Sequence, residues 1–280
     1  MQFKQSFIER YSKITDFNKF KETSLRTPRK SFRVNTLKTS VREIKQKLKY
    51  LNLEQIPWCG EGFFVNKKII GLGNLLEYSL GHIYIQEASS MIPALVLNPG
   101  ENDLVLDMAA SPGSKTTQLA CLMNNKGLII ANDVDIKRLK SLSMNIQRCG
   151  LTNTIITLQE GRFFKDFKFD KILLDAPCSG TGTISKSESP VKDFSENTIK
   201  RLAGTQRQLI STAFENLKDN GTLVYSTCSI DPEENESIIN FLLEKYSNAR
   251  LEKIEIKGLK TSSPILEFNG NKYSSELKNV

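Results

Sequence analysis

From about residue 91 onward, apolar runs of strand length alternate with longer segments in which apolar residues recur at helical spacing. The pattern predicts strands at 102–110, 127–133, 154–160, 169–177 and 221–229, and helices at 114–123, 135–150, 198–217 and 232–246. Alternation of this kind predicts an α/β fold with a doubly wound, open sheet and helices on both faces. We expect this sheet to form the core of a domain over residues 91–280.

Residues 1–90 follow a different pattern and predict a small α/β module. Apolar side chains recur at roughly helical spacing over residues 3–21, and Pro28 then breaks the helix. Residues 39–51 predict another helix, with Thr39 or Ser40 as its N-cap. Its apolar face would consist of Val41, Ile44, Leu48 and Leu51. Strands are predicted at 32–37, 61–66 and 82–86.

The composition excludes several classes of protein. The chain has 280 residues, 39% hydrophobic and 25% charged, as globular domains do. It holds no run of about 18 apolar residues, and its charged N-terminus lacks the apolar core of a secretory signal. We therefore expect no membrane partner and a cytoplasmic location.

The five cysteines are scattered without a CxxC pair, and His82 is the single histidine. This distribution argues against a zinc site and against a disulfide framework, so we expect no metal. We expect Cys59, Cys121 and Cys149 to be small, partly buried apolar residues.

Positive charge is concentrated at the start of the chain. Residues 1–50 hold 14 Lys and Arg against 4 Asp and Glu, whereas the remainder holds 25 against 27. This asymmetry is the charge distribution expected for contact with a polyanion such as nucleic acid. A solvated helix face rich in lysine is the alternative interpretation.

The first strand of the main domain leads into DMAASPGSKTTQLA, in which small residues and a Pro-Gly pair join the strand to a helix capped near Ser114. Such a turn lets a ligand approach the backbone and the amides of the helix start. Asp133 ends the next strand, where an acidic residue can accept hydrogen bonds from ribose hydroxyls. Neither GxGxxG nor GxxxxGK[ST] occurs. A nucleoside cofactor without pyrophosphate, such as S-adenosylmethionine, fits this pattern, and an ordinary strand–helix connection is the alternative.

Cys178 and Cys228 both follow strand-like runs, in DAPCSGTG and YSTCS. A cysteine that only packs belongs within a strand rather than at this rim. The carboxyl ends of the strands are where open α/β sheets bind ligands. The two thiols are therefore candidates for nucleophilic chemistry.

A thiolate beside a methyl donor suggests one reaction. Carbon 5 of a pyrimidine is a poor nucleophile, but a thiolate added to carbon 6 makes it able to accept a methyl group. Lys115 is a candidate for the positive charge that lowers the thiol pKa. Asp175 could offset charge near ring nitrogen 3, if protonated or sharing a proton with the base. A second cysteine could assist expulsion of the first, and the residues alone leave open which cysteine attacks.

Five segments resemble motifs of the RsmB/NOP (Sun) family of RNA 5-methylcytosine methyltransferases: FRVNTLK, YIQEASSMIPALVLNP, DMAASPGSKTTQLA, KILLDAPCSGTGT and LVYSTCSIDPEENE. The resemblance runs from about residue 31 to 245. It implies a Rossmann-like class I methyltransferase fold and methyl transfer from S-adenosylmethionine to carbon 5 of a cytosine in RNA. The compact chain is similar to archaeal tRNA members, which implies tRNA as the substrate and an unstacked target base.

The resemblance also implies roles for individual residues. Cys228 would be the nucleophile, Cys178 would help to release the product, and Asp175 would bridge cofactor and base beside Lys115. The implied cofactor-binding residues are Ala109, Ala110, Ser111, Pro112, Gly113, Ser114, Lys115, Asp133, Arg138, Glu160 and Asp175.

The chain departs from the family pattern at three places. AASPGSK stands where the family commonly has AAPGGK, and Glu160 stands where it often has Asp near the adenine. The chain also stops at SSELKNV, before the usual hairpin with a GFF-type segment. We therefore expect either a truncated sequence or a sheet without its final edge strand, which would expose an edge.

Three other functions remain open from the sequence. They are methylation of rRNA cytosine, a non-catalytic RNA-binding factor on the same fold, and methylation of DNA cytosine or protein. Intact Lys115, Asp133, Asp175, Cys178 and Cys228 argue against the non-catalytic factor. No heptad run or long apolar stripe indicates a dimer, so we expect a monomer.

Overall fold

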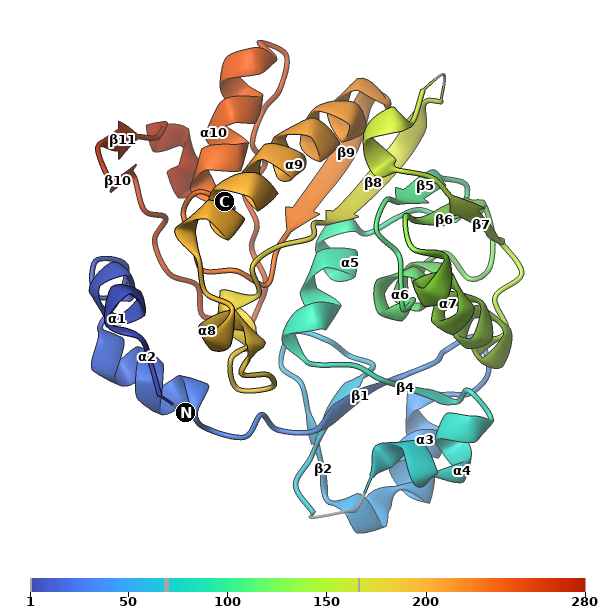
Figure 1. Cartoon of the computed structure of the whole chain (residues 1–280). Coiled ribbons are helices and arrows are strands. Elements are labelled where there is room, and N and C mark those ends of the chain that lie inside the picture. The colour runs from blue at the N-terminus through green and yellow to red at the C-terminus, as the bar shows by residue number, and fades with distance from the viewer. Residues whose placement is uncertain (1, 68–70, 166, 280) are drawn as a thin grey trace.

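Five parallel strands form the central sheet of the computed structural model, which describes residues 2–67, 71–165 and 167–279 (Figure 1). They are β5 (Leu104–Asp107), β6 (Leu128–Asp133), β7 (Thr154–Leu158), β8 (Phe169–Asp175) and β9 (Leu217–Ser226). Their order is β7-β6-β5-β8-β9. The strands that follow β5 are added on one side of it as far as β7, and β8 and β9 are then added on its other side, so the strand order reverses between β5 and β8. Ligands of open α/β sheets bind at the carboxyl ends of the strands beside such a reversal.

Helices cover both faces of this sheet, which confirms the predicted α/β architecture (Figure 1). One face carries α5 (Ile92–Leu97), α6 (Ser114–Leu122) and α7 (Ile136–Cys149), and the other carries α9 (Glu196–Glu215) and α10 (Glu236–Lys245). Successive residues of β5 show why: Val105 packs with the core under α5 and α6, and Leu106 packs with the core under α9 and α10. Side chains alternate between the faces of a strand, so an uninterrupted apolar run fills both cores.

A second sheet of four antiparallel strands lies in the N-terminal part of the chain, in the order β2-β3-β1-β4. These strands are β1 (Ser31–Val34), β2 (Leu53–Gln55), β3 (Gly62–Val65) and β4 (Ile83–Ile85). The helices beside them are α3 (Val41–Lys47) and α4 (Leu76–Ser79). Ser40 is the N-cap of α3 and forms a capping box with Glu43, which decides between the two predicted caps. The sequence patterns predicted β1, β3 and β4 but missed β2.

The predicted helix over residues 3–21 is wrong, because two helices replace it: α1 (Gln5–Tyr11) and α2 (Phe17–Ser24). Asp16 breaks the run by accepting hydrogen bonds from the amides of Asn18 and Lys19, so it caps α2. The apolar residues of both helices still form one cluster, which packs on residues 184–194 around α8 (Ser189–Lys192). The rings of Phe7 and Phe194 lie 5.0 Å apart.

The remaining elements are short. They are β10 (Glu267–Phe268), β11 (Asn271–Lys272) and the 3-10 turns η1 (Lys49–Leu51), η2 (Leu72–Asn74), η3 (Ser89–Met91), η4 (Gly161–Phe163), η5 (Thr181–Thr183) and η6 (Ser275–Asn279). The division of the chain at residue 90 stays a proposal. Within the part of the chain that the structure describes, no helix has the length and apolar character needed to cross a membrane.

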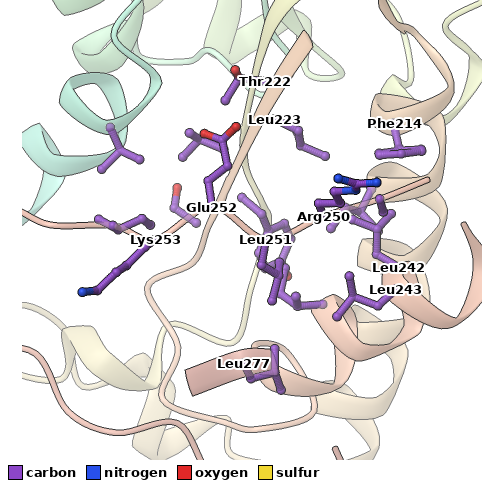
Figure 2. Close-up of a pocket in the computed structure, with 18 of the residues that line it drawn as sticks. Phe214, Thr222, Leu223, Leu242, Leu243, Arg250, Leu251, Glu252, Lys253 and Leu277 are labelled. Atoms are coloured by element: carbon purple, nitrogen blue, oxygen red, sulfur yellow. The ribbon is translucent and has the colours of Figure 1, made fainter. Parts of the chain in front are cut away.

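β9 is an edge strand of the parallel sheet, and an open groove of about 1650 Å³ runs beside it. Figure 2 shows this groove between β9, α10 and the segment around Leu251, with Leu223, Leu242 and Leu277 among its lining residues. The described residues that line it do not include Cys178 or Cys228.

Candidate active site

The loop between β5 and α6 crosses the carboxyl end of the sheet. Gly113 precedes α6 with φ of +103°, so glycine occupies the N-cap and Ser114 is the first helical residue, in agreement with a cap near Ser114. A Cβ atom at Gly113 would lie 2.9 Å from a methyl group of Leu142. The position therefore needs glycine both for its left-handed backbone and for the close packing of α7.

Asp133 and Arg138 fix this loop from the end of β6. The buried Asp133 carboxylate accepts hydrogen bonds from the Ser111 amide at 3.1 Å and the Asp135 amide at 3.0 Å. Arg138 lies 3.5 Å from the same carboxylate and donates to the Ser111 carbonyl at 2.7 Å. The structure thus brings the predicted loop, Asp133 and Arg138 together. Each carboxylate oxygen has a further lone pair with which to accept a ribose hydroxyl.

Asp107 is a polar residue of this site that the sequence analysis missed. It ends β5, is fully buried and accepts a hydrogen bond from the Thr116 hydroxyl at 2.7 Å. Burial raises the pKa of Asp107 to about 6. Its Oδ1 and the buried hydroxyl of Ser111 have no hydrogen-bond partner among the described residues. Unpaired buried polar atoms beside a cofactor loop fit a ligand with several donors, such as the ammonium and ribose hydroxyls of S-adenosylmethionine.

Glu160 follows β7 and thus lies at the same end of the sheet. Its side chain is 44% exposed and forms an ion pair with Arg162 at 2.6 Å. The predicted contact of Glu160 with the cofactor adenine stays a prediction. Among the described residues, no group of three or more His, Cys, Asp or Glu side chains could hold a metal ion.

The two candidate thiols lie side by side beyond neighbouring strands. Asp175 ends β8 and pairs in register with Ser226 at the end of β9, so the segments that follow leave the sheet together. The sulfur atoms of Cys178 and Cys228 are 3.0 Å apart, and the Cys228 amide donates to the Cys178 sulfur at 3.2 Å. Cys228 is exposed, whereas Cys178 is half-buried. Both are free thiols in this structure.

Glycine lets the two thiol segments approach one another. The Gly182 amide donates to the Cys228 carbonyl at 2.9 Å. A Cβ atom at Gly182 would lie 2.9 Å from that same carbonyl oxygen, so a larger residue would displace the Cys228 backbone. Gly180 takes φ of +71°, which glycine adopts without strain. The letters SGTG after Cys178 therefore have a structural reason.

Lys115 connects the cofactor loop to the thiol side of the site. Its ammonium donates to Asp175 Oδ2 at 2.6 Å, and the Ser226 hydroxyl donates to Asp175 Oδ1 at 2.8 Å. The Lys115 side chain is 12% exposed, whereas that of Asp175 is 36% exposed, so the ion pair is partly open to solvent. All four residues predicted to be catalytic are thus assembled at one end of the sheet.

Electrostatics distinguish the two thiols. A hydrogen bond from the Cys178 thiol lowers the pKa of Cys228, and Lys115 lowers it further, against the opposing effects of burial and Asp175. The same hydrogen bond, together with burial, raises the pKa of Cys178. Either sulfur of the 3.0 Å contact could be the donor, so the assignment of Cys228 as the thiolate rests on these pKa directions and stays a prediction. The residue pattern alone had left this choice open.

We expect iodoacetamide to modify Cys228 at lower pH than an ordinary cysteine, whose pKa is about 8.5. The thiolate is the reactive form, so the rate should rise as pH passes through the lowered pKa and fall below it. In Cys178→Ala the donor is lost, and the midpoint should move to higher pH. Mass spectrometry of the Cys228 peptide measures this. A midpoint that Cys178→Ala leaves unchanged would contradict the assigned hydrogen bond.

The open parallel sheet, with the β5–α6 loop and the two adjacent thiols at the carboxyl ends of its strands, defines a Rossmann-like fold. The family model for 16S rRNA methyltransferase RsmB/F matches residues 94–270, and that for the N-terminal domain of 16S rRNA methyltransferase RsmF matches residues 3–88. The chain belongs to the RsmB/F family of methyltransferases.

Three relatives are informative. The chain is 44% identical to the tRNA (cytosine(49)-C(5))-methyltransferase of Pyrococcus abyssi, over 99% of this chain and 92% of that protein. It is also 44% identical to the ribosomal RNA small subunit methyltransferase F of Vibrio campbellii, over 83% of this chain but only 50% of that protein. Among solved structures, a methyltransferase homolog protein from Pyrococcus horikoshii superimposes with a TM-score of 0.86 at 38% identity, covering 99% of this chain and 88% of that one.

Proposed function

We propose that this protein transfers a methyl group from S-adenosylmethionine to carbon 5 of a cytosine in tRNA, through a transient bond between Cys228 and the base. One observation carries the proposal. The paired thiols of Cys178 and Cys228 lie 3.0 Å apart, beside the Lys115–Asp175 pair that joins them to the cofactor loop. The family to which the chain belongs supports the same reaction class.

The first step is the attack of the Cys228 thiolate on carbon 6 of the cytosine. The new S–C bond moves an electron pair into the ring, and negative charge develops toward ring nitrogen 3. Asp175, which accepts a hydrogen bond from the Lys115 ammonium at 2.6 Å, would share a proton with that nitrogen and so offset the charge. Carbon 5 then has enamine character and can attack an electrophile.

Residues 109–115, with Asp107, Asp133 and Arg138, would hold S-adenosylmethionine, which supplies an electrophilic methyl group when bound. The unpaired Asp107 Oδ1 and Ser111 hydroxyl are the strongest support for this assignment, because each offers a buried polar atom to the ligand. Asp133 would accept from the ribose hydroxyls. Lys115 at the start of α6 and Asp175 at the end of β8 form an ion pair, and this pair would help to orient the two reactants.

Release requires the carbon 5 proton to leave to solvent, the proton shared with ring nitrogen 3 to return to Asp175, and the S–C bond to break, which returns the electron pair to Cys228 and restores the double bond between carbons 5 and 6. The thiol of Cys178 can donate a hydrogen bond to that departing sulfur across the 3.0 Å contact. The interaction that lowers the pKa of Cys228 thus also makes it a better leaving group. This gives Cys178 a physical role in release.

The N-terminal part of the chain offers a surface for RNA phosphates. Of the 14 basic residues in positions 1–50, only Arg10 and Arg33 are buried. The others are exposed: Lys4, Lys13, Lys19, Lys21, Arg26, Arg29, Lys30, Lys38, Arg42, Lys45, Lys47 and Lys49. Lys and Arg on one part of a surface bind the nucleic-acid backbone without regard to sequence and position the substrate.

We prefer tRNA to rRNA as the substrate because of the share of each relative's length that this chain matches. The tRNA methyltransferase of P. abyssi matches this chain over 92% of its own length, whereas the chain spans half of the rRNA methyltransferase of V. campbellii. Methylation of rRNA is the second candidate, because that relative is equally similar over the matched segment. We further propose that the enzyme acts as a monomer in the cytoplasm.

Bisulfite sequencing tests this function. Unmodified tRNA and, separately, small-subunit rRNA are incubated with the protein and S-adenosylmethionine, and protected cytosines are mapped. We expect a protected cytosine in tRNA, at one position and only with the cofactor present. Protection confined to rRNA would favour the second candidate, and protection of neither RNA would overturn both.

A further inference from the structure

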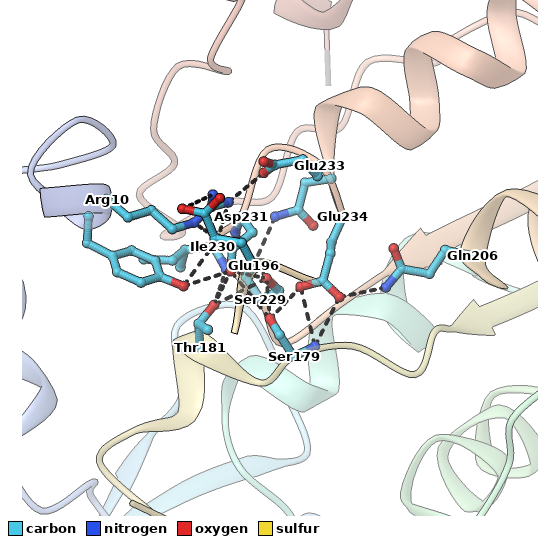
Figure 3. Close-up of polar contacts among 12 residues, drawn as sticks. Arg10, Ser179, Thr181, Glu196, Gln206, Ser229, Ile230, Asp231, Glu233 and Glu234 are labelled. Carbon is cyan, nitrogen blue, oxygen red and sulfur yellow. Dashed lines mark hydrogen bonds and ion pairs between the residues drawn. The ribbon is translucent and has the colours of Figure 1, made fainter. Parts of the chain in front are cut away.

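Glu234 lies beneath the Cys178 segment, although in sequence it follows Cys228 by six residues and Cys178 by 56. Its fully buried carboxylate accepts hydrogen bonds from the Ser179 amide and from Gln206 Nε2, each at 3.0 Å, and from the Ser179 hydroxyl. Ser179 directly follows Cys178, so these bonds hold the backbone from which the Cys178 thiol projects (Figure 3).

Two further hydrogen bonds, one to the Glu234 carbonyl and one made by its partner Gln206, connect Glu234 to the segments that carry the two thiols. Its own carbonyl accepts a hydrogen bond from the Tyr225 hydroxyl at 2.6 Å, which fastens it to β9, the strand that leads to Cys228. Gln206 also donates to the Pro177 carbonyl at 2.8 Å, on the other side of Cys178. Glu234 therefore joins the Cys178 segment to the Cys228 strand.

The charges around Glu234 set it apart from its neighbours in Figure 3. Asp231 lies 2.8 Å and Glu233 lies 2.7 Å from the guanidinium of Arg10. Among the ion pairs of the described residues, none includes Glu234, whose hydrogen-bond donors are an amide, a hydroxyl and a side-chain amide. Burial of a carboxylate with only neutral donors is costly, so a purely structural position would favour an uncharged residue.

We infer that Glu234 is a positioning residue that holds the Cys178 thiol against Cys228. Its effect on catalysis rests on the proposed function, because that function gives Cys178 its role in release. Glu233 provides a matched control, since it is the adjacent glutamate and its described hydrogen bonds go to Arg10 rather than to the Cys178 segment.

Formation of a disulfide by diamide measures the positioning without any RNA. Diamide takes up two electrons and two protons, and the two thiols become one disulfide. We expect Glu234→Ala to slow formation of the Cys178–Cys228 disulfide roughly tenfold or more, because small misplacements of reacting atoms cost large factors in rate. Glu234→Gln keeps one acceptor for the Ser179 amide and should give an intermediate rate, whereas Glu233→Ala should match the wild type.

Cofactor binding by calorimetry reports whether each variant is folded. If Glu234→Ala does not fold, Glu234→Gln decides the question alone. Disulfide formation at the wild-type rate in the folded Glu234 variants would overturn the inference.

A second readout follows the covalent protein–RNA adduct on denaturing gels. Glu234→Ala should accumulate the adduct as Cys178→Ala does, whereas a merely destabilised protein would form less of it. If Cys178→Ala accumulates the adduct and folded Glu234→Ala releases it at the wild-type rate, the inference fails and the proposed function stands. If Cys178→Ala accumulates none, the proposed release step fails, and the diamide rates still decide whether Glu234 positions the thiol.

Discussion

Cys228→Ala is expected to abolish RNA methylation while S-adenosylmethionine still binds. Without a thiolate to add to carbon 6, carbon 5 of cytosine stays a poor nucleophile, and the remaining residues only bind and orient the substrates. Removal of a catalytic nucleophile lowers turnover on the order of 10⁴-fold or more. The measurement is incorporation of labelled methyl groups into tRNA, with calorimetry of cofactor binding beside it.

Cys121→Ser is the control for loss of a thiol elsewhere. The Cys121 sulfur contacts Arg33 and Asn35, where a hydroxyl can replace it, so this variant should methylate RNA normally. Full activity in Cys228→Ala would remove Cys228 from the nucleophile role. Activity that survives in Cys228→Ala but disappears in Cys178→Ala would indicate the opposite order of the two cysteines.

Cys178→Ala is expected to form the adduct with RNA and then release it slowly. The donor to the departing Cys228 sulfur is missing in this variant, and loss of a positioned proton donor lowers a rate by roughly 10²-fold or more. Adduct formation should also be slower at neutral pH, because the pKa of Cys228 rises toward its ordinary value. A shifted band on denaturing gels, stable over many turnover times of the wild type, is the expected observation.

Two controls separate release from binding in Cys178→Ala. The base in the adduct should be methylated only when S-adenosylmethionine is present. The double variant Cys178→Ala/Cys228→Ala should form no adduct and therefore show no band. Rapid turnover without any accumulated adduct would contradict a role for Cys178 in release.

Much of the fold followed from the apolar pattern. The central strand β5 is buried on both faces, as Val105 and Leu106 illustrate, and such runs predict both the strand and the covering helices. The N-terminal helices were harder to predict. The apolar spacing continues through Asp16, and only the capping hydrogen bonds of that residue divide the helix. The strand β2 (LEQ) has no fully buried residue and therefore gives no apolar pattern, whereas the equally short β4 (IYI) is apolar.

The site was predictable where function lies in contiguous motifs and unpredictable where it depends on contacts between segments. Strand-end placement brought Lys115, Asp175, Cys178 and Cys228 together as predicted, since neighbouring parallel strands end at the same edge. Asp107 lies within the first motif, but its unpaired oxygen is visible only in three dimensions.

Glu234 is likewise linked to the Cys178 segment only by contacts that the three-dimensional structure shows. Its bonds to Ser179 and Gln206 span 55 and 28 residues of sequence, and no local spacing indicates them. The choice between the two cysteines likewise depends on which sulfur donates and which charges surround it. The residues around Cys178 and around Cys228 are similar in type, and both cysteines follow a strand, so the sequence does not distinguish them.

RNA that contains 5-fluorocytidine tests the central claim most directly. Fluorine at carbon 5 cannot leave as a proton does, so methyl transfer should end in a stable protein–RNA bond. After incubation with S-adenosylmethionine, digestion with nuclease and protease and mass spectrometry identify the modified peptide. We predict a methylated 5-fluorocytidine on Cys228, and attachment to Cys178 or the absence of any linked peptide would contradict the account.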